Sequence, residues 1–437
     1  MKIAVLGTGY VGLSTGVSLS EIGHQVTCID IDDQKISGLQ QGISPIYEPG
    51  LETLLVKNTE VGRLIFTTSH KAGIEGAEII IITVGTPQRQ DGGADLSYLE
   101  QAAMDISAHI KKGTIVVIKS TVPVGTTEYI KKIIEEKCHQ EVLLVSNPEF
   151  LRQGSAIHDT MNADRIIIGF ENKEAAEKVQ AMYRPLQVPV IFTDFRSAEM
   201  IKYASNAFLA TKISFINEIS NLCDAVGANV EDVAIGMGKD KRIGEAFLQA
   251  GIGFGGSCFP KDVKALLHTA GLYGVNFSLL KETISINDFQ KELLVKKAVK
   301  RFGELKGKKI GILGLPFKPE TDDMREAPSI KIAQSLIKLG AEVVAYDPVG
   351  AEQAKRIIGD TIQYASTVFD AVLGADALFI VTEWKEFTQM DLASLTKKMN
   401  CPIIFDGRNC LEEDRIRQCE KIEYYPIGKR SILIGKP

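Results

Sequence analysis

Several features that mark other classes of protein are missing from this sequence. It has no block of five or more basic residues and a net charge of −5 at pH 7, so nucleic acid is not an expected partner. Its longest apolar runs, such as Ile79–Ile82 and Ile115–Ile118, have the length of a strand, so no membrane contact is expected. Because Met1–Gly7 already has a strand-like pattern, it leaves no room for a signal peptide, and we expect a cytoplasmic protein.

Cysteine and histidine are not arranged as they are in disulfide-rich or zinc proteins. The seven cysteines are an odd number, and the last three (Cys401, Cys410 and Cys419) have neither a C-x-x-C pair nor a nearby histidine. This pattern indicates no secreted disulfide framework, and we predict no metal site. None of the six histidines falls in a motif, so we expect a carboxylate or an ordered water as general base.

The composition is that of a globular enzyme with more than one domain. The chain has 437 residues, of which 45% are hydrophobic and 24% are charged. At roughly 150 residues per domain, this length suggests two or three domains. Strand patterns alternate with amphipathic helical patterns in the first part of the chain, which is typical of βαβ units in a parallel sheet. Strands are expected at Lys2–Leu6, Gln25–Ile29, Leu64–Thr67, Glu78–Thr83, Thr114–Ile118, Glu141–Val145, Arg165–Phe170 and Pro189–Thr193.

A different pattern follows in Ser197–Val226, which contains neither glycine nor proline. Its apolar residues recur at spacings of three, four and seven, which predicts one long helix that ends at Gly227. At 1.5 Å per residue such a helix would be about 45 Å long, more than one domain needs. We therefore expect it to join two domains and to pair with a second copy in a homodimer.

The alternating pattern restarts near residue 308 and repeats the first. Asp347 stands at the tip of its second strand as Asp30 does in the first domain, but Gly311 and Gly314 lack the full glycine spacing of a dinucleotide site. We therefore predict an α/β protein with two Rossmann-like, doubly wound parallel-sheet domains joined by a long central helix. The predicted parts are residues 1–196, 197–300 and 301–437. Expected elements of the last part are strands Lys309–Leu313, Glu342–Tyr346, Ala377–Val381 and Pro402–Phe405, and helix Ala327–Leu339.

The first strand is followed by a turn that is typical of a dinucleotide site. Gly7–Gly12 has the G-x-G-x-x-G spacing, which permits a tight turn, a close backbone approach to pyrophosphate and close helix packing. Asp30, at the end of the second strand, would accept hydrogen bonds from an adenosine ribose and repel a 2′-phosphate, which favours NAD over NADP. The predicted cofactor-binding residues of this turn are Gly7, Gly9, Tyr10, Val11 and Gly12.

Three short polar or proline-containing segments follow other predicted strands: Gly85–Pro87, Ser120–Pro123 and Asn147–Phe150. Each could be an ordinary turn. Because ligands bind at the carboxyl ends of strands in an open parallel sheet, we expect all three to border one cofactor and substrate cleft.

The segment Gly253–Asp262 (GFGGSCFPKD) carries the clearest chemical signal. Its glycines would let backbone amides approach a ligand, and a thiol and a carboxylate follow at Cys258 and Asp262. A nearby lysine or helix amides would favour the reactive thiolate. A cysteine with only a structural role would more naturally sit within an apolar run.

Together these motifs resemble the UDP-glucose 6-dehydrogenase family of nucleotide-sugar dehydrogenases over nearly the whole chain. Simpler β-hydroxyacid dehydrogenases share the glycine turn but lack the cysteine segment. The matching segments are Gly7–Gly12, Ser120–Pro123, Asn147–Leu151, Lys202 with Asn206, Gly253–Asp262, Phe317–Pro319 and Asp323–Glu326.

The resemblance implies oxidation of a sugar C6 alcohol to an acid by two NAD molecules. An aldehyde forms first and is captured by Cys258 as a thiohemiacetal, which is oxidised to a thioester and then hydrolysed. The resemblance also implies that Lys202 and Asn206, one helical turn apart, steady the developing oxyanion. It assigns proton transfer and water positioning to Thr121 and Asp262, and thioester hydrolysis to Glu149.

Further binding residues are implied by the same resemblance. Residues 1–196 would bind NAD, residues 197–300 would form the central dimerisation region with the cysteine loop, and residues 301–437 would bind UDP-sugar. Implied NAD contacts outside the glycine turn are Asp30, Lys35, Thr86, Thr121, Gln153, Lys261 and Arg325. Implied UDP-glucose contacts are Glu149, Phe150, Leu151, Lys202, Asn206, Arg242, Phe247, Leu248, Gln249, Ala250, Gly251, Gly255, Lys318 and Arg408.

One position departs from the family, and the exact substrate stays open. Gln153 replaces the glutamate that the family usually has near the nicotinamide, which keeps a hydrogen-bond acceptor and removes a charge. Asn147–Leu151 and Phe247–Gly251 favour glucose, but the same chemistry on a UDP-N-acetylhexosamine or GDP-mannose is an alternative. A non-catalytic sensor of NAD or UDP-sugar is a further alternative, against which Cys258, Lys202 and Asp262 argue.

Overall fold

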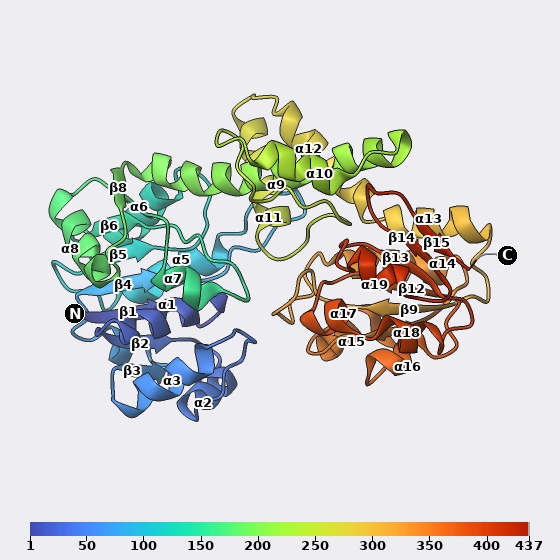
Figure 1. The fold of residues 1–437 in the computed structure, drawn as a ribbon. Coiled ribbons are helices and arrows are strands. Elements are labelled where there is room, and N and C mark those ends of the chain that lie inside the picture. Colours follow the sequence, from blue (N-terminus) through green and yellow to red (C-terminus); the bar gives the residue numbers. More distant parts are fainter. Residues whose placement is uncertain (436–437) are drawn as a thin grey trace. The chain divides into compact units, whose positions relative to one another are not determined.

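The computed structural model describes residues 1–435 and divides into two compact units (Figure 1). Unit 1 comprises residues 1–205 and 264–275, and unit 2 comprises residues 206–263 and 276 onward. The long helix α9 (Phe195–Val226) and the helix α11 (Phe259–Leu272) each have residues in both units.

Unit 1 is built on an eight-stranded sheet in the order β3-β2-β1-β4-β5-β6-β7-β8. The strands from β3 to β6 are parallel, and β7 is antiparallel to β6. The strands are β1 (Lys2–Leu6), β2 (Gln25–Ile29), β3 (Leu64–Thr67), β4 (Ile79–Ile82), β5 (Ile115–Ile118), β6 (Leu143–Ser146), β7 (Ile166–Phe170) and β8 (Val190–Thr193). The helices are α1 (Tyr10–Glu21), α2 (Asp33–Gln40), α3 (Leu51–Glu60), α4 (His70–Ile74), α5 (Ser97–Ser107), α6 (Thr126–Cys138), α7 (Ala156–Met161), α8 (Lys173–Tyr183) and the short 3₁₀ helix η1 (Arg184–Leu186).

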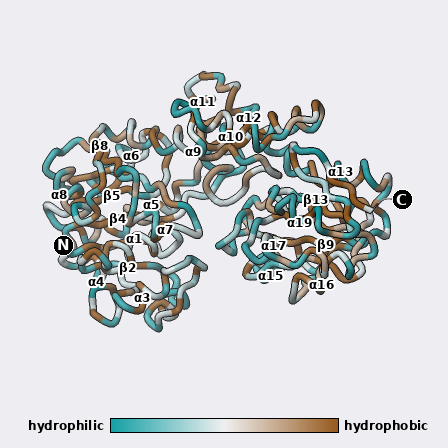
Figure 2. The backbone as a smooth tube through the Cα atoms, viewed as in Figure 1, coloured by the Kyte–Doolittle hydropathy of each residue, from teal (hydrophilic) through white to brown (hydrophobic). Residues whose placement is uncertain are grey.

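Alternate residues of the central strands serve two cores, one on each face of this sheet. In β4, Ile79 and Ile81 pack with helices α1, α2, α3 and α8, whereas Ile80 and Ile82 pack with α4, α5 and α6. A strand buried on both faces must be apolar throughout, which explains the unbroken isoleucine run. Figure 2 shows the hydrophobic colouring of these inner strands.

Unit 2 contains a second sheet, in the order β11-β10-β9-β12-β13-β14-β15. Its first five strands follow the same relative order as β3-β2-β1-β4-β5, and only β15 is antiparallel to its neighbour. Helices α13, α14 and α15 pack on one face and α16 to α19 on the other. The strands are β9 (Lys309–Leu313), β10 (Glu342–Tyr346), β11 (Gln363–Tyr364), β12 (Ala377–Ile380), β13 (Ile403–Asp406), β14 (Ile422–Tyr425) and β15 (Ile432–Ile434). The helices are α10 (Val230–Gly238), α12 (Ser278–Gln290), α13 (Leu293–Phe302), α14 (Pro328–Lys338), α15 (Ala351–Ile358), η2 (Gly359–Thr361), α16 (Val368–Val372), α17 (Lys385–Gln389), α18 (Leu392–Thr396) and α19 (Glu413–Arg417).

The predicted fold class is confirmed. Every strand expected from the sequence is present, with ends that differ by at most two residues, and the long helix begins at Phe195 rather than Ser197. The sequence did not predict β11, β14 and β15, which are short or lie near the edge of the second sheet. The division of the chain into 1–196, 197–300 and 301–437 stays a prediction.

Candidate active site

The glycine turn of unit 1 fits a dinucleotide. A Cβ atom added to Gly12 would overlap the Gly7 carbonyl oxygen, so the helix packs against the strand end only with glycine there. A Cβ added to Gly9 would meet nothing within 4 Å, which leaves open space beside the turn for a pyrophosphate. Tyr10 and Val11 begin helix α1 directly after Gly9, so the α1 N-terminus faces this space and would favour an anion.

Asp30 lies at the carboxyl end of β2, beside this turn. Its Oδ2 atom accepts hydrogen bonds from Thr8 N (2.8 Å) and Thr8 Oγ1 (2.7 Å), and Lys35 Nζ lies 3.1 Å away. Burial would raise the pKa of Asp30, but the hydrogen bonds from Thr8, Lys35 and Asp32 hold it below its usual value. A charged carboxylate is therefore held where an adenosine ribose is expected.

The predicted convergence of strand ends is confirmed within unit 1. Strands β1, β4, β5 and β6 are parallel neighbours, so the segments that follow them leave the same edge of the sheet. Thr86 Oγ1 donates to Thr121 O over 2.7 Å, which joins two of these segments directly.

The segment Ile43–Gly50 was not selected in the sequence analysis. It forms hydrogen bonds with two parts of this edge, the first turn of α1 and the loop that contains Gln153. Tyr10 donates a 2.5 Å hydrogen bond to Tyr47 O, and the buried Glu48 carboxylate accepts from Gly154 N and Ala156 N, both at 2.7 Å. The loop that contains Gln153 is therefore fixed by a carboxylate from a distant segment. A glutamate within a proline- and glycine-rich stretch was the only available signal for this role.

Glu149 and Lys202 form a buried ion pair in unit 1, with Lys202 Nζ 2.9 Å from Glu149 Oε1. The other Glu149 oxygen accepts from Leu151 N over 2.5 Å. Burial would raise the pKa of Glu149, but the charges of Lys202 and Lys119 and the Leu151 hydrogen bond hold it below its usual value. Lys202 also lies over the Phe150 ring, with Nζ 5.3 Å from its centroid.

Asn206 and Asp262 form a second buried group, in unit 2, beside the partly exposed Lys261. Asn206 Nδ2 donates to Asp262 Oδ2, and Lys261 Nζ lies by Asp262 Oδ1, both at 2.7 Å. Cys258 directly precedes helix α11, and its carbonyl oxygen accepts from Asp262 N in the first turn. The predicted nucleophile, an amide donor and a carboxylate therefore lie on neighbouring segments of one unit.

Three buried amide side chains hold the loop before Cys258, and the sequence analysis missed all three. Asn287 of α12 accepts from Phe254 N (2.7 Å) and donates to Phe254 O (3.0 Å). Gly251 N donates to Asn217 Oδ1 and Gly251 O accepts from Gln290 Nε2, both over 2.8 Å. The loop Gly251–Phe254 is thereby tied to α9 and α12 by four side-chain hydrogen bonds.

The other side of this loop contacts the segment after β9. Gly256 N donates to Arg325 O over 2.8 Å, and a Cβ on Gly256 would come 2.8 Å from the Phe317 ring. Arg325 itself forms a two-point hydrogen bond with Asp323. Lys318 follows Phe317, with Nζ 5.6 Å from that ring.

Arg408 and the Phe247–Gly251 stretch lie beside the same loop, whereas Arg242 does not hydrogen-bond with it. Arg408 donates to Phe317 O and Val381 O, and a Cβ on Gly251 would lie 3.6 Å from Arg408 Nη1. Phe247 has φ = 64°, an unusual conformation for an aromatic residue and one that is often found at functional sites. The Arg242 guanidinium is exposed and pairs with Asp240 at 2.6 Å. The remaining predicted contacts, Leu248, Gln249 and Ala250, lie between Phe247 and Gly251.

Asp347 shows how the second sheet differs from the first. It is buried and accepts hydrogen bonds from Leu315 N, Val349 N, Gly350 N and Trp384 Nε1, at 2.7–3.0 Å. Burial raises the pKa of this carboxyl group. Asp30 also accepts four hydrogen bonds within its own domain, but its side chain is 11% exposed, whereas Asp347 is buried.

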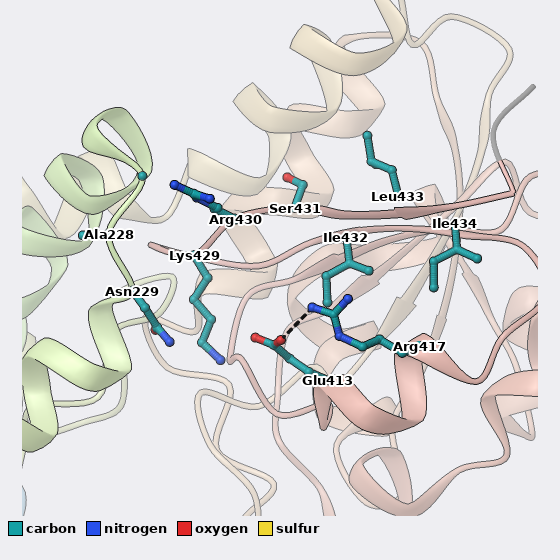
Figure 3. Close-up of a pocket in the computed structure, with 11 residues that line it drawn as sticks. Ala228, Asn229, Glu413, Arg417, Lys429, Arg430, Ser431, Ile432, Leu433 and Ile434 are labelled. Carbon is teal, nitrogen blue, oxygen red and sulfur yellow. Dashed lines mark hydrogen bonds and ion pairs between the residues drawn. The ribbon is translucent and has the colours of Figure 1, made fainter.

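A pocket of about 430 Å³ in unit 2 contains none of the predicted site residues (Figure 3). It is lined by Gly227–Asn229, Glu413, Arg417 and Lys429–Ile434. Two of its cations pair locally: Lys429 with Glu231 at 2.6 Å, and Arg417 with Glu413 at 3.3 Å. We therefore assign no ligand to it.

Neither a metal cluster nor a membrane-spanning helix was found in the part of the chain that the structure describes. Within residues 1–435, no three His, Cys, Asp or Glu side chains are grouped so that they could hold a metal ion. Over the same residues, no helix is both long and apolar enough to cross a membrane.

The first sheet, its glycine turn and Asp30 define an NAD-binding oxidoreductase. The chain belongs to the UDP-glucose/GDP-mannose dehydrogenase family. It matches the NAD binding domain of that family over residues 1–187, the central domain over 196–289 and the UDP binding domain over 311–413. NAD is therefore its cofactor.

Relatives and solved structures of this family cover the whole chain. The chain is 54% identical over 435 residues to UDP-glucose 6-dehydrogenase YwqF of Bacillus subtilis, which covers 99% of each chain. It is similar to the structure of a UDP-glucose dehydrogenase from Pyrobaculum islandicum, with a TM-score of 0.92, 36% identity and 98% of each chain covered. It is also similar to a UDP-D-ManNAc dehydrogenase from Pyrococcus horikoshii, with a TM-score of 0.87, 29% identity, and 98% and 99% of the two chains covered.

Proposed function

We propose that this chain oxidises the C6 alcohol of UDP-glucose to the carboxylate of UDP-glucuronate, with two NAD as hydride acceptors. For each UDP-glucose, two NAD and one water are consumed, and one UDP-glucuronate, two NADH and three protons are formed. The observation that carries this proposal is Cys258 at the end of a clamped glycine-rich loop, in a chain that is 54% identical to a named UDP-glucose 6-dehydrogenase.

Cys258 is the proposed nucleophile. Its place before the first turn of α11 favours the thiolate, because helix N-termini stabilise negative charge. The thiolate adds to C6 of the aldehyde, and the resulting oxyanion takes up a proton to give a thiohemiacetal. Loss of a hydride from C6 and of the hydroxyl proton gives a thioester, and water then cleaves the C–S bond and restores the thiol.

Lys202 and Asn206 are the proposed donors to the oxygen on C6. They lie one turn apart on α9, so both can face one oxygen atom. The amide of Asn206 is oriented by Asp262, and the ammonium group of Lys202 by Glu149. Thr121 and Asp262 are proposed to position water and transfer protons, and Glu149 to serve as base in thioester hydrolysis.

Cationic and backbone groups of unit 2 are the proposed contacts of the UDP-sugar. Lys318 and Arg408 follow strands of the second sheet, and their charges suit a diphosphate. Phe247–Gly251 and Gly255 offer backbone atoms on the clamped loop. Arg242 is proposed to contact the substrate as well, and Arg325, Lys261 and Gln153 to contact NAD.

The sugar specificity is tested with a panel of nucleotide sugars. We expect UDP-glucose to be oxidised with two NADH for each UDP-glucuronate. UDP-N-acetylhexosamines and GDP-mannose should react at least tenfold more slowly, because a pocket that fits one sugar discriminates against others on that scale. A higher kcat/KM with a UDP-N-acetylhexosamine would move the assignment to that substrate. Binding of UDP-glucose without NADH formation would favour a sensor.

The proposed assembly is a cytoplasmic homodimer built on α9. Along its unit 2 part, Phe208, Phe215 and Leu222 recur every seven residues, and they are 65%, 46% and 58% exposed. Such a stripe along one helix is typical of a helix that packs against a partner. A second copy of the same helix is the proposed partner.

A further inference from the structure

A buried lysine beside Glu149 has no role in the scheme above. Lys119 directly follows β5, and its Nζ lies 3.2 Å from Asn147 Oδ1 and 3.3 Å from the Tyr183 hydroxyl. Within the described residues, no carboxylate lies at ion-pair distance from it. Burying an ammonium group without such a partner costs free energy, so we expect a role that accounts for a buried lysine at this position.

The position of Lys119 is fixed by its neighbours. The Tyr183 hydroxyl donates to Asn147 Oδ1 over 2.6 Å, and Asn147 Nδ2 donates to Ile167 O over 2.8 Å. The amide of Asn147 is therefore oriented with its oxygen toward Lys119 and Tyr183. Because these side chains are buried and Asn147 is tied to the backbone, the lysine cannot swing away as a surface lysine can.

Glu149, two residues after Asn147, is the carboxylate that this charge can serve. Its contacts within unit 1 are Lys202 from α9 and the Leu151 N–H, and Lys119 acts on it from the end of β5. The other titratable groups nearby are Tyr183 of α8 and Arg165, which stacks on the Phe150 ring at 3.7 Å. Glu149 thus has one cation in direct contact, and a second cation is held by Asn147, two residues before Glu149 in the chain.

In the proposed reaction Lys202 also donates to the oxygen on C6, so its charge is shared and holds the Glu149 carboxylate less strongly. A buried carboxylate that is held less strongly by its cation takes up a proton more readily, and it can then no longer act as a base. We propose that Lys119 is a positioning residue, which fixes the Asn147–Glu149 segment and keeps the Glu149 carboxylate charged while Lys202 serves the substrate. This inference rests on the proposed function.

The test is the pH dependence of kcat in full-length Lys119→Gln and Lys119→Met. The midpoint of the acid limb should rise by about one pH unit, because a neutral side chain no longer favours the charged form of Glu149. At the wild-type midpoint this shift corresponds to a roughly fivefold lower kcat, whereas the alkaline plateau should stay within about threefold. Lys119→Met is included because it leaves no unsatisfied polar atom in the buried cluster.

Tyr183→Phe is the matched control, because it removes the hydrogen bonds of the hydroxyl with Asn147 and Lys119 and leaves every charge in place. Its acid limb should coincide with that of the wild type. Equal loss of kcat at every pH in the Lys119 variants, or an unchanged limb, would overturn the inference and leave the proposed function intact. A wild-type enzyme that forms no UDP-glucuronate would instead overturn the proposed function, and the inference with it.

Discussion

Cys258 is the residue on which the proposed chemistry most directly depends. If it captures the aldehyde, Cys258→Ala should separate the two oxidations. The first hydride transfer needs only NAD and a base, whereas the second needs a tetrahedral adduct held at C6. The variant should therefore form at most one NADH per sugar and no acid, while the wild type forms two. Product analysis by mass spectrometry together with NADH absorbance measures both quantities.

A structural role for this cysteine would give a different result. Cys223, a buried cysteine of α9, is the matched control, and Cys223→Ala should keep two NADH per sugar. Acid formation by Cys258→Ala at close to the wild-type rate would mean that the covalent mechanism is wrong for this chain.

Lys202 is the charged donor of the proposed oxyanion site. Removing one pre-aimed donor typically costs 10²–10³ in rate, so Lys202→Ala should lower kcat by at least ~10². NAD affinity should change little, because the proposed role lies at the sugar end of the cleft. Steady-state kinetics and NAD titration separate the two effects. Near-normal kcat with weakened NAD binding would show that the role has been misassigned.

Asp30 should set the preference for NAD over NADP. Its carboxylate would repel a 2′-phosphate, while Lys35, 3.1 Å away, is a cation that could receive one. In Asp30→Ser we expect the ratio of kcat/KM for NAD over that for NADP to fall at least tenfold, the scale on which one charge contact discriminates. Equal use of both cofactors by the wild type would contradict this role. The control is Asp33→Ser, because Asp33 is an exposed carboxylate in the first turn of α2.

The clamped loop before Cys258 is the element expected to position the proposed nucleophile. Asn287 pairs with both backbone groups of Phe254, so Asn287→Leu leaves a buried N–H and a buried C=O unsatisfied. Because the loop should then hold Cys258 less precisely, we expect kcat to fall by about tenfold or more. For the same reason, the rate at which iodoacetamide alkylates Cys258 should differ from that of the wild type. Peptide mass spectrometry follows the alkylation. The exposed Asn276→Leu controls for the substitution type, and an unchanged kcat in Asn287→Leu would show that the clamp does not matter for catalysis.

The elements differ in how far the sequence could predict them. The unbroken apolar runs of β4 (IIII) and β5 (IVVI) were recognisable because a strand buried on both faces must be apolar throughout. The strand-end segments could be grouped because parallel strands end at one edge. The amides of Asn217, Asn287 and Gln290 could not be found in this way, since polar residues on amphipathic helices are usually exposed and only the folded chain brings them to one loop. Glu48, in a loop, and Lys119, directly after β5, could not be found either, because charged residues in such places are usually exposed.

At the scale of the whole molecule, the chain matches one family, but its two sheets belong to domains that match different ligands, an NAD binding domain and a UDP binding domain. Both sheets place their first strands in the same relative order, and both carry an aspartate after the second strand. Each aspartate accepts four hydrogen bonds, but the Asp30 side chain is partly exposed beside the glycine turn, whereas Asp347 is buried under Trp384 and backbone N–H groups. The burial of Asp347 and the incomplete glycine spacing at Gly311 and Gly314, rather than a change of fold, therefore distinguish the second sheet from the NAD-binding sheet.

The exposed stripe on α9 leads to the last prediction, which concerns assembly. Phe208, Phe215 and Leu222 lie on one helical face, and Val226 continues it at 66% exposure. Because seven residues are close to two helical turns, these side chains can pack continuously against an antiparallel or parallel copy. Covering them on association removes apolar surface from water, which stabilises the pair.

Light scattering after gel filtration at micromolar concentration should give about twice the 47.7 kDa chain mass for the wild type. Phe215→Asp would bury a charge in the proposed interface, at a cost that well-packed neighbours cannot offset, and should give the mass of one chain. Ile357→Asp, at a 50% exposed position on α15 outside the stripe, should stay dimeric. A wild-type monomer with full activity, or a Phe215→Asp dimer as stable as the wild type, would mean that this face of α9 does not hold two copies together.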